Sequence, residues 1–506
     1  MKKCIKSAFI SVYHKDGLGV IVRELHALGV TICSTGGTGD FISELGIPIT
    51  KVETLTDYPS ILGGRVKTLH PKVLGGILVR RDNVSDKQDM IEYEIPPIDL
   101  VIVDLYPFKQ TVASGANHVD IIEKIDIGGI TLIRAAAKNY NDVTIVSHQG
   151  QYSRLLDILE TQGTEITEQQ RYDFAVEAFG VTSHYDTAIH SYFNNADVFN
   201  LTVGPAKELR YGENPHQKGT CYGDLGIMFQ KLHGKEISTN NLGDIDAAVG
   251  LMNDIKEGIA FAIIKHANSC GFAIRPTLIE AWKDALAGDS ESAFGGIFIT
   301  NTKMDKVTAD EINKIFYEVV IAPEYEDEAL EILMSKKDRI ILAMEKQTPA
   351  LQQIKYLPNL HVMIVQDTDI NIETVDDLKM VTNVLPTAEQ ITDLLLANVI
   401  VKHLKSNGIA LVKNGQVISI GTGQTSRVDA LEQAIKKAKK FGFDITGAVM
   451  ASEAFFPFPD CVQIAHEAGI AAVIQPGGSI KDQLSIDYCN EVGMAMVLTG
   501  VRHFKH

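Results

Sequence analysis

The sequence predicts an α/β protein that begins with a mostly parallel open sheet and continues into further α/β units. Three observations lead to this prediction. The chain has 506 residues, which is too long for one hydrophobic core and favours two to four domains. Its first part alternates apolar, strand-like runs with amphipathic helix patterns. Short apolar runs bounded by turn residues return near the carboxyl end.

In the first part, strands and helices are expected to alternate along the chain. This order implies a parallel sheet covered by helices, because parallel strands need long crossover connections. The expected strands are SAFISV (7–12), VTICS (30–34), IDLVIVDLYP (98–107) and DVTIVS (142–147). The expected helices are GLGVIVRELHALG (17–29), GGTGDFISELG (36–46) and GGITLIRAAAKNY (128–140).

A domain boundary is expected near residue 200. Residues 168–195 are expected to be largely helical, and residues 198–212, which include Gly204 and Pro205, to connect two domains. The resulting domains are 1–199 and 200–506. The second exceeds one usual core, so two subdomains are expected, although no linker marks their split. The late strands are expected at 408–413, 416–421, 445–452, 470–475 and 494–500, with a tight hairpin at the NG between the first two.

Composition excludes several classes of protein. The formal net charge of -17 argues against a general nucleic-acid binder, so any phosphate site must be local. The amino-terminal segment fails as a secretory signal, and no apolar run approaches the ~18 residues of a membrane span. The six cysteines are too scattered for a CxxC pair or a disulfide framework. We therefore expect a soluble intracellular protein with reduced thiols.

Three segments of the first domain carry candidate site residues. STGGT (34–38) places glycines and hydroxyls where a strand passes into a helix, which favours an anion, although such a turn can serve geometry alone. GGRVKTLHP (63–71) concentrates basic residues between glycines and a proline and is either a binding loop or a soluble surface loop. In DIGGITLIRAAAKN (126–139), a helix cap is the better explanation of Asp126 considered alone.

The combination of motifs is more specific than any one of them. STGGT, LGGRVKTLHP, LYPF and DIGGITLIRAAAKN occur in this order in the cyclohydrolase half of the bifunctional purine biosynthesis proteins, and the chain resembles that family. RYGENPHQ, IIKHANSCG, SAFGG, KNGQVISIGTGQTSR, SEAFFPFPD and RHFKH are similar to segments of its transformylase half. The resemblance covers nearly the whole chain.

The resemblance implies both a fold and a function. Domain 1–199 would have a methylglyoxal-synthase-like fold, and domain 200–506 would contain two cytidine-deaminase-like subdomains. The enzyme would transfer a formyl group from 10-formyltetrahydrofolate to an aminoimidazole carboxamide ribonucleotide and then close the product to inosine monophosphate. It would be a cytoplasmic homodimer that acts on small molecules without a catalytic metal, and that binds neither nucleic acid nor membranes.

For ring closure, the resemblance assigns residues to the two ends of one nucleotide. The reaction needs cationic donors for a developing oxyanion and a proton acceptor. Two departures from the family pattern stand out: Tyr13 replaces a usual serine, which puts a phosphate contact there in question, and Asp104 replaces a usual asparagine. The reacting groups would be met by Lys67, Tyr106, Asp126 and Lys138, and the phosphate by Lys15, Thr35, Gly37, Thr38, Arg65 and Thr68.

For formyl transfer, the resemblance points to the pair Lys265 and His266. The attacking aromatic amine is a weak nucleophile, so a base must remove its proton, and a neutral imidazole suits this role near pH 7. Lys265 would stabilise the oxyanion or protonate the departing folate nitrogen. A KH pair by itself carries little information. The substrates would be bound by Arg210, Tyr211, His216, Asn241, Asn407 and Arg427, with Phe458 and Asp460 bordering substrate or folate and Arg502 on the phosphate.

The sequence leaves two alternative functions to be considered. A zinc nucleoside deaminase is disfavoured, because neither an HxE segment followed by PCxxC nor a close cysteine pair is present. A ligand-sensing nucleotide-binding protein without turnover is the other alternative, since a fold does not itself confer chemistry.

Overall fold

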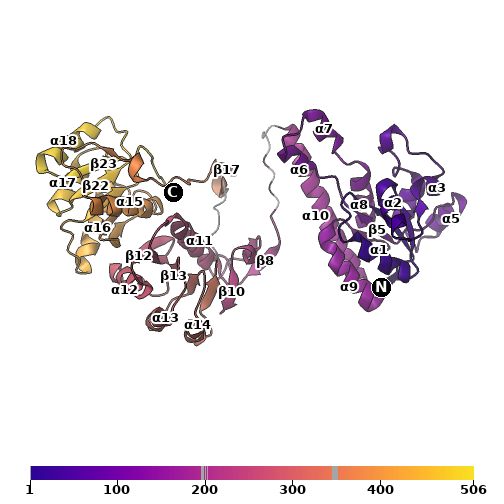
Figure 1. Cartoon of the computed structure of the whole chain (residues 1–506), viewed down its shortest axis with the longest axis horizontal. Helices are drawn as coiled ribbons and strands as arrows, with labels where there is room; N and C mark the ends of the chain where they lie inside the picture. Colours follow the sequence, from indigo (N-terminus) through magenta and orange to yellow (C-terminus); the bar gives the residue numbers. More distant parts are fainter. Residues whose placement is uncertain (1, 195–198, 200, 202, 345–351) are drawn as a thin grey trace. The chain divides into compact units, whose positions relative to one another are not determined.

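The computed structural model describes residues 2–194, 199, 201, 203–344 and 352–506 (Figure 1). The chain divides into two compact units, Met1–Thr202 and Val203–His506. The expected connection at 198–212 falls partly on residues 198, 200 and 202, which lie outside the described residues. Its later part is more than a linker, because β8 (Ala206–Leu209) pairs antiparallel with β9 (Gly219–Tyr222).

The first unit is built around a five-stranded sheet in the order β4-β3-β2-β5-β6, in which every pairing is parallel. All residues of β5 are buried, so helices cover both faces of the sheet, and the α/β prediction is confirmed. The strands are β2 (Ser7–Ser11), β3 (Thr31–Ser34), β4 (Thr50–Lys51), β5 (Leu100–Val103) and β6 (Thr144–Val146). A separate antiparallel pair consists of β1 (Lys3–Cys4) and β7 (Glu165–Ile166).

The helices of the first unit include the three that the sequence predicts between strands, which are α1, α2 and α8. A capping box of Thr167 and Gln170 begins the long helix α10. The helices are α1 (Leu18–Ala27), α2 (Gly36–Glu44), α3 (Val52–Thr56), α4 (Pro71–Leu78), α5 (Val84–Glu92), α6 (Phe108–Ala113), α7 (His118–Glu123), α8 (Gly128–Lys138), α9 (Tyr152–Gln162) and α10 (Glu168–Phe193).

The second unit contains one twelve-stranded sheet shared by two halves of the same topology. The strand order is β12-β11-β13-β14-β15 in the first half and β20-β19-β21-β22-β23 in the second. The halves join where β12 pairs antiparallel with β20, through Ala273 and Gln416. The late strands predicted from the sequence are β19 to β23, and the predicted hairpin lies between β19 and β20.

The two halves run through the same succession of elements. The first half consists of α11 (Thr239–Asp254), β11 (Ile259–Lys265), β12 (Asn268–Arg275), α12 (Leu278–Gly288), β13 (Ile297–Thr300), α13 (Lys306–Ile312), β14 (Val319–Ala322), α14 (Asp327–Met334) and β15 (Ile340–Ala343). The second consists of α15 (Ala388–Lys402), β19 (Ile409–Lys413), β20 (Gln416–Gly421), α16 (Arg427–Lys440), β21 (Val449–Ser452), α17 (Asp460–Glu467), β22 (Ala472–Gln475), α18 (Asp482–Val492) and β23 (Ala495–Leu498). The edge strands are β10 (Gln230–His233) and β18 (Lys379–Met380), and a separate hairpin consists of β16 (Gln352–Leu357) and β17 (Val362–Asp367).

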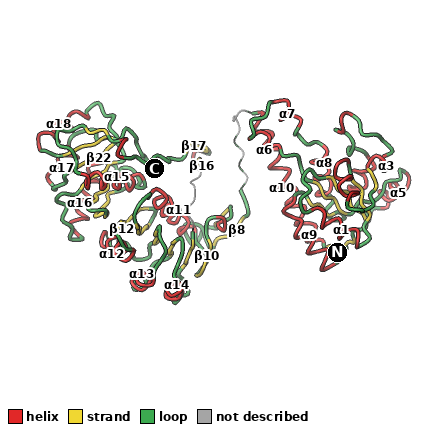
Figure 2. The backbone as a smooth tube through the Cα atoms, viewed as in Figure 1, coloured by secondary structure: helices red, strands yellow, loops and turns green. Residues whose placement is uncertain are grey.

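Each central strand of the second unit contributes to two cores. Along β11, Phe261 and Ile263 pack in the core beneath α12 to α14, whereas Ala260, Ala262 and Ile264 pack in the core beneath α11 and α15. The core beneath α11 and α15 continues into the second half, so both halves depend on it. Helices flank the strands in each unit (Figure 2).

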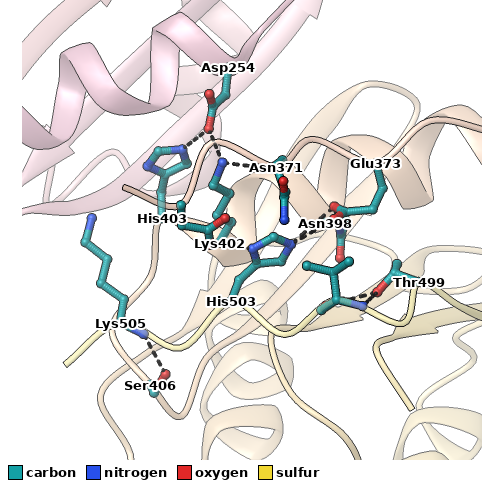
Figure 3. A network of polar contacts seen from close by, with 12 residues as sticks. Asp254, Asn371, Glu373, Asn398, Lys402, His403, Ser406, Thr499, His503 and Lys505 are labelled. Carbon is teal, nitrogen blue, oxygen red and sulfur yellow. Dashed lines mark hydrogen bonds and ion pairs between the residues drawn. The ribbon is translucent and has the colours of Figure 1, made fainter. Parts of the chain in front are cut away.

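A buried polar cluster ties the two halves together at the carboxyl ends of α11 and α15 (Figure 3). Asp254 accepts hydrogen bonds from Lys402 Nζ at 2.9 Å and bonds His403 Nε2 at 2.8 Å. Burial lowers the pKa of His403, so its imidazole stays neutral near pH 7. The ammonium of Lys402 also donates to the carbonyl of Asn371 at 2.8 Å.

The same cluster holds the carboxyl-terminal segment through His503 (Figure 3). Its Nδ1 lies 2.6 Å from Asp369 Oδ2, and its Nε2 lies 3.2 Å from the carboxylate of Glu373. Glu373 in turn accepts from Asn398 Nδ2 at 2.6 Å. Although burial opposes the charged form, these two carboxylates raise the pKa of His503 to about 9. The segment is therefore held by a protonated, almost fully buried imidazolium.

His503 should make stability depend on pH. Its pKa in the folded state, about 9, exceeds the ordinary histidine value of 6.5, so its contribution is complete below pH 6.5 and is lost as pH rises through about 9. We expect the difference in unfolding free energy between the wild type and His503→Gln to shrink by about 3 kcal/mol over that window. Urea unfolding at a series of pH values measures it, and a difference that is independent of pH would contradict the charged state.

Candidate functional site

The first unit has a cavity of about 1150 Å³ where β2, β3 and β5 end. In parallel sheets the ligand crevice lies beyond the carboxyl ends of the strands, and this cavity has that position. It is large enough for a nucleotide. The predicted residues that line it are Lys15, Thr35, Gly37, Thr38, Arg65, Lys67, Thr68, Tyr106 and Asp126.

One side of this cavity is suited to an anion. The amino terminus of α2 faces it, and aligned backbone dipoles at a helix amino terminus favour negative charge. A methyl group added at Gly36 would lie 3.4 Å from Lys67 Nζ, so the ammonium lies against the same turn. The hydroxyl of Thr38 bonds the backbone of Val12, and that of Thr35 bonds Ser11, so these threonines anchor α2 to the end of β2.

The other side carries a carboxylate and a phenol. Asp126 Oδ1 accepts the backbone N–H of Gly129 at 2.6 Å, as a cap of α8 would. Burial raises the pKa of Asp126, which makes its carboxylate a better proton acceptor. Burial also raises the pKa of Tyr106, with the charge of Asp126 adding to the effect. The hydroxyl of Tyr185, from α10, accepts the backbone N–H of Asp126 at 2.9 Å.

The two departures from the family pattern lie beside each other in this cavity. Asp104 accepts the backbone N–H groups of Tyr13 and His14 and bonds the ring of His14 at 2.8 Å. The ring of Tyr13 packs edge-to-face on Tyr106 at 5.6 Å, and Lys124 lies over both rings. Asp104 thus holds the turn that presents Tyr13 to the cavity.

Two predicted residues have other surroundings. The guanidinium of Arg65 is exposed and forms an ion pair with Glu123, which also lines the cavity. Lys138 is the last residue of α8, and its side chain is exposed and does not line the cavity. The structure therefore brings the predicted cyclohydrolase residues together in one cavity except for Lys138, and the roles of all of them stay predictions.

In the second unit, Lys265 and His266 line a smaller cavity of about 170 Å³. Lys265 ends β11 and donates from Nζ to the carbonyl of Phe294 at 2.6 Å. His266 and Ala267 form the turn into β12, with φ of 52° and 58°. Such left-handed backbone is unfavourable for residues with a side chain and is found at sites that the surrounding structure stabilises.

Two further predicted residues, Asn407 just before β19 and Arg427 at the start of α16, bond each other. Arg427 Nη2 donates to Asn407 Oδ1 at 2.7 Å, and Nη1 lies 2.5 Å from Glu453 Oε2 and 2.9 Å from Ser452 Oγ. Arg427 and Glu453 are almost completely buried. Arg427 is therefore held in a buried ion pair, and Asn407 is the member of the pair that lies nearer the surface.

The remaining predicted transformylase residues do not line the small cavity. Asn241 is buried and completes the capping box of α11 with Ser238. The segment before α11 is attached to that helix, because Thr239 Oγ1 donates to the carbonyl of Tyr211 at 2.9 Å. Exposed side chains belong to Arg210, His216, Phe458 and Arg502, while Asp460 is half-buried at the start of α17.

Some residues that shape the sites were missed by the sequence analysis. Tyr185 supports Asp126 from α10, and Thr422 and Lys437 reach the small cavity from the second half of the sheet. Lys437 is paired with the buried Asp289 at 2.6 Å. Thr422 lies within the segment KNGQVISIGTGQTSR but was not singled out there, and no local pattern marks Tyr185 or Lys437, because each reaches its site only through the order of the strands and helices.

Neither a metal cluster nor a membrane span is evident in the part of the chain that the structure describes. No group of three or more His, Cys, Asp or Glu side chains there is placed to hold a metal ion. No helix among the described residues is long and apolar enough to cross a membrane.

Comparisons with known proteins cover the whole chain. The family model described as AICARFT/IMPCHase bienzyme matches residues 136–437, and the one described as MGS-like domain matches residues 17–131. The "Bifunctional purine biosynthesis protein PurH" of Bacteroides thetaiotaomicron is 62% identical over 100% of this chain and 99% of its own. Proteins of the same name from Aquifex aeolicus and Acetivibrio thermocellus are 46% and 45% identical, over 99% of this chain and 100% of theirs.

One solved structure, described as "Crystal structure of ForH", is 34% identical and covers 37% of this chain and 99% of its own, with a TM-score of 0.34. At that score it adds nothing to the description of the fold. The two family models and the full-length identity agree with the order of the motifs along the chain. This chain belongs to the AICARFT/IMPCHase bienzyme family, with an MGS-like domain at its amino-terminal end.

Proposed function

We propose that this chain carries out two successive steps of purine synthesis in the cytoplasm. It transfers a formyl group from 10-formyltetrahydrofolate to aminoimidazole carboxamide ribonucleotide, and it closes the formamido product to inosine monophosphate. Residues 1–199 would carry the cyclohydrolase and residues 200–506 the transformylase. The observation that carries the proposal is full-length family membership, combined with two cavities in separate units, each lined by catalytic residues expected for one step.

Ring closure is assigned to the large cavity of the first unit. The amino terminus of α2 with Lys15, Arg65 and Thr68 would bind the ribonucleotide phosphate. The carboxamide nitrogen attacks the formyl carbon, and a C–N bond forms. The formyl oxygen becomes an oxyanion, which leaves as water after proton transfer. Lys67 would stabilise that oxyanion, and Asp126, with its raised pKa, would accept the proton from nitrogen.

Formyl transfer is assigned to the cavity that contains Lys265 and His266. The amino group on the imidazole ring of the nucleotide attacks the formyl carbon. His266 takes a proton from that amino group as the tetrahedral oxyanion forms. The bond from that carbon to the folate nitrogen then breaks, and a proton is returned to this nitrogen. Lys265, which ends β11 beside His266, would stabilise the oxyanion or supply that proton. The residues present need no metal for this route.

We also propose that a second copy of this chain completes the transformylase site. The cavity around His266 has a volume of about 170 Å³, below the roughly 300 Å³ at which drug-sized ligands are usually enclosed. Arg210, Phe458 and Arg502 are exposed in the single chain and could meet substrate from across an interface. Phe458 would offer an apolar face to the flat folate.

The two half-reactions should be separable by substitution. His266→Ala should lower formyl transfer at least ~100-fold while closure of supplied formamido nucleotide stays near the wild-type rate. Asp126→Asn should have the opposite effect, and Lys138→Ala tests whether a residue outside the cavity also contributes to closure. A two-stage assay that offers first the amino nucleotide and then the formamido nucleotide measures both.

A folded variant that lost both half-reactions would contradict this division of labour. Tight nucleotide binding by the wild type without turnover, over a range of pH and folate forms, would favour the sensing alternative. Stoichiometric bound zinc would reopen the deaminase alternative.

Closure should also be sensitive to a single methyl group. In Gly129→Ala the new carbon would lie 2.7 Å from Asp126 Oδ2, so the carboxylate must move. We expect closure to slow by roughly 10- to 100-fold, since small misplacements of a reacting group have effects of that size. Gly180→Ala on α10 is the matched control, because nothing lies within 4 Å of the added methyl. Equal closure rates in the two variants would contradict the expected dependence of closure on the position of the Asp126 carboxylate.

A shared transformylase site predicts complementation between inactive variants. His266→Ala and Arg502→Ala should each lack formyl transfer, but a mixture refolded or exchanged together should regain about a quarter of wild-type activity, because mixed dimers contain one intact site. Equal mixtures assayed before and after subunit exchange measure this. Absence of any recovery in verified mixed dimers would place both residues in one chain's site.

A further inference from the structure

The repeated topology of the second unit contains two equivalent turns that can be compared. Each half begins with a helix, α11 or α15, that a capping box starts and that is followed by an antiparallel hairpin. The hairpin turn is His266–Ala267 in the first half and Asn414–Gly415 in the second. All four residues have positive φ, of 52° and 58° in the first turn and 51° and 70° in the second.

The two turns differ in how well their residues suit that backbone. Asn-Gly is a preferred pair where both central residues of a hairpin need positive φ. His-Ala is not, because the Cβ of alanine crowds the backbone in the left-handed region, where glycine has no such cost. The first half therefore keeps an unfavourable turn at the point where His266 lies in the cavity. Some interaction outside the turn must hold it.

An aspartate at the same place in each helix supplies that interaction. Asp393, the sixth residue of α15, accepts the backbone N–H groups of Asn414 and Gly415, each at 2.7 Å. Asp244, the sixth residue of α11, accepts the N–H of Ala267 at 2.7 Å. Hydrogen bonds to a carboxylate are roughly twice as strong as neutral ones.

Further contacts hold the His266–Ala267 turn through Asn268, the residue that follows it. Asn268 Nδ2 donates to the carbonyl of His266 at 2.9 Å, and Thr422 Oγ1 lies 3.0 Å from Asn268 Oδ1. Asn268 and Thr422 line the cavity with His266, whereas Asp244 does not. Asp244 thus reaches the reacting centre only through the backbone of Ala267.

We propose that Asp244 is a positioning residue for formyl transfer, which holds the unfavourable His266–Ala267 turn so that the imidazole stays in the cavity beside Lys265. This inference rests on the proposed transformylase role of that cavity. Asp393 uses the same interaction in the other half, where the turn residues suit the backbone. The aspartate is therefore structural in one half and functional in the other.

The test asks whether removing the Asp244 carboxylate lowers formyl transfer and whether a glycine in the turn restores it. Asp244→Ala should lower kcat for formyl transfer by about 100-fold with KM nearly unchanged, because the base is misplaced while the substrate contacts remain. Adding Ala267→Gly should restore most of the loss, since glycine adopts the turn without the carboxylate. Asp244→Asn, whose amide oxygen can still accept the N–H, should fall between. Closure of the formamido nucleotide should be unaffected in all three.

Asp393→Ala is the matched control, because it removes the equivalent carboxylate from a turn of Asn-Gly. It should leave formyl transfer within about twofold of the wild type at a temperature where the protein is folded. If Asp244→Ala does not fold, Asp244→Asn with and without Ala267→Gly gives the same comparison. Failure of Ala267→Gly to rescue, or a rise in KM without a fall in kcat, would overturn the positioning role.

Crystal structures of the variants separate this inference from the proposed function. Asp244→Ala should displace the His266 ring from the cavity, and the double variant should return it. A wild type without formyl transfer would refute the proposed function but leave this displacement measurable. An unmoved ring in Asp244→Ala would refute the positioning role even in an active enzyme.

Discussion

Burial of the central strands on both faces is the constraint on which the rest of the structure depends. Every residue of β5 is buried in the first unit, and alternate residues of β11 enter two different cores in the second. The polar side chains that line the large cavity therefore lie at the ends of these strands or in the segments that follow them. The large cavity lies where β2, β3 and β5 end, and the smaller one lies where β11 turns into β12. Both candidate sites lie at the ends of strands whose central residues are apolar and buried.

Strand ends also leave backbone N–H groups that need partners, and carboxylates meet this need repeatedly. Asp104 accepts those of Tyr13 and His14 after β2, and Asp244 accepts that of Ala267 after β11, while Asp126 does the same for Gly129 at the amino terminus of α8. Each bond fixes a turn that presents a side chain to a cavity. The acidic composition of the chain is compatible with binding anions, because Asp104 and Asp126 in the large cavity accept backbone N–H groups while Lys15, Lys67 and the amino terminus of α2 supply positive potential there.

Part of this architecture could be predicted from local pattern. Apolar runs identified β2, β3, β5 and β6, and the Asn-Gly pair identified the hairpin of β19 and β20. The predicted site residues of the first unit, apart from Lys138, do line one cavity. Pattern did not reveal how several polar side chains are used: Thr38 bonds Val12, Asn241 caps α11, and Arg427 is paired with Glu453. Those partners are distant in sequence or belong to helix ends, so residue type alone does not distinguish anchoring from ligand binding.

The sequence by itself determined the α/β class, most strand and helix positions and the chemistry grouped in each motif, because these depend on residues within a few positions of one another. Only the tertiary structure decided that the two halves of the second unit share one sheet, and that β12 joins β20. It also decided that Asp244 and Thr422 converge on the turn of His266. Strand order brings such residues together, and strands buried on both faces have no periodicity that records which neighbour each will take.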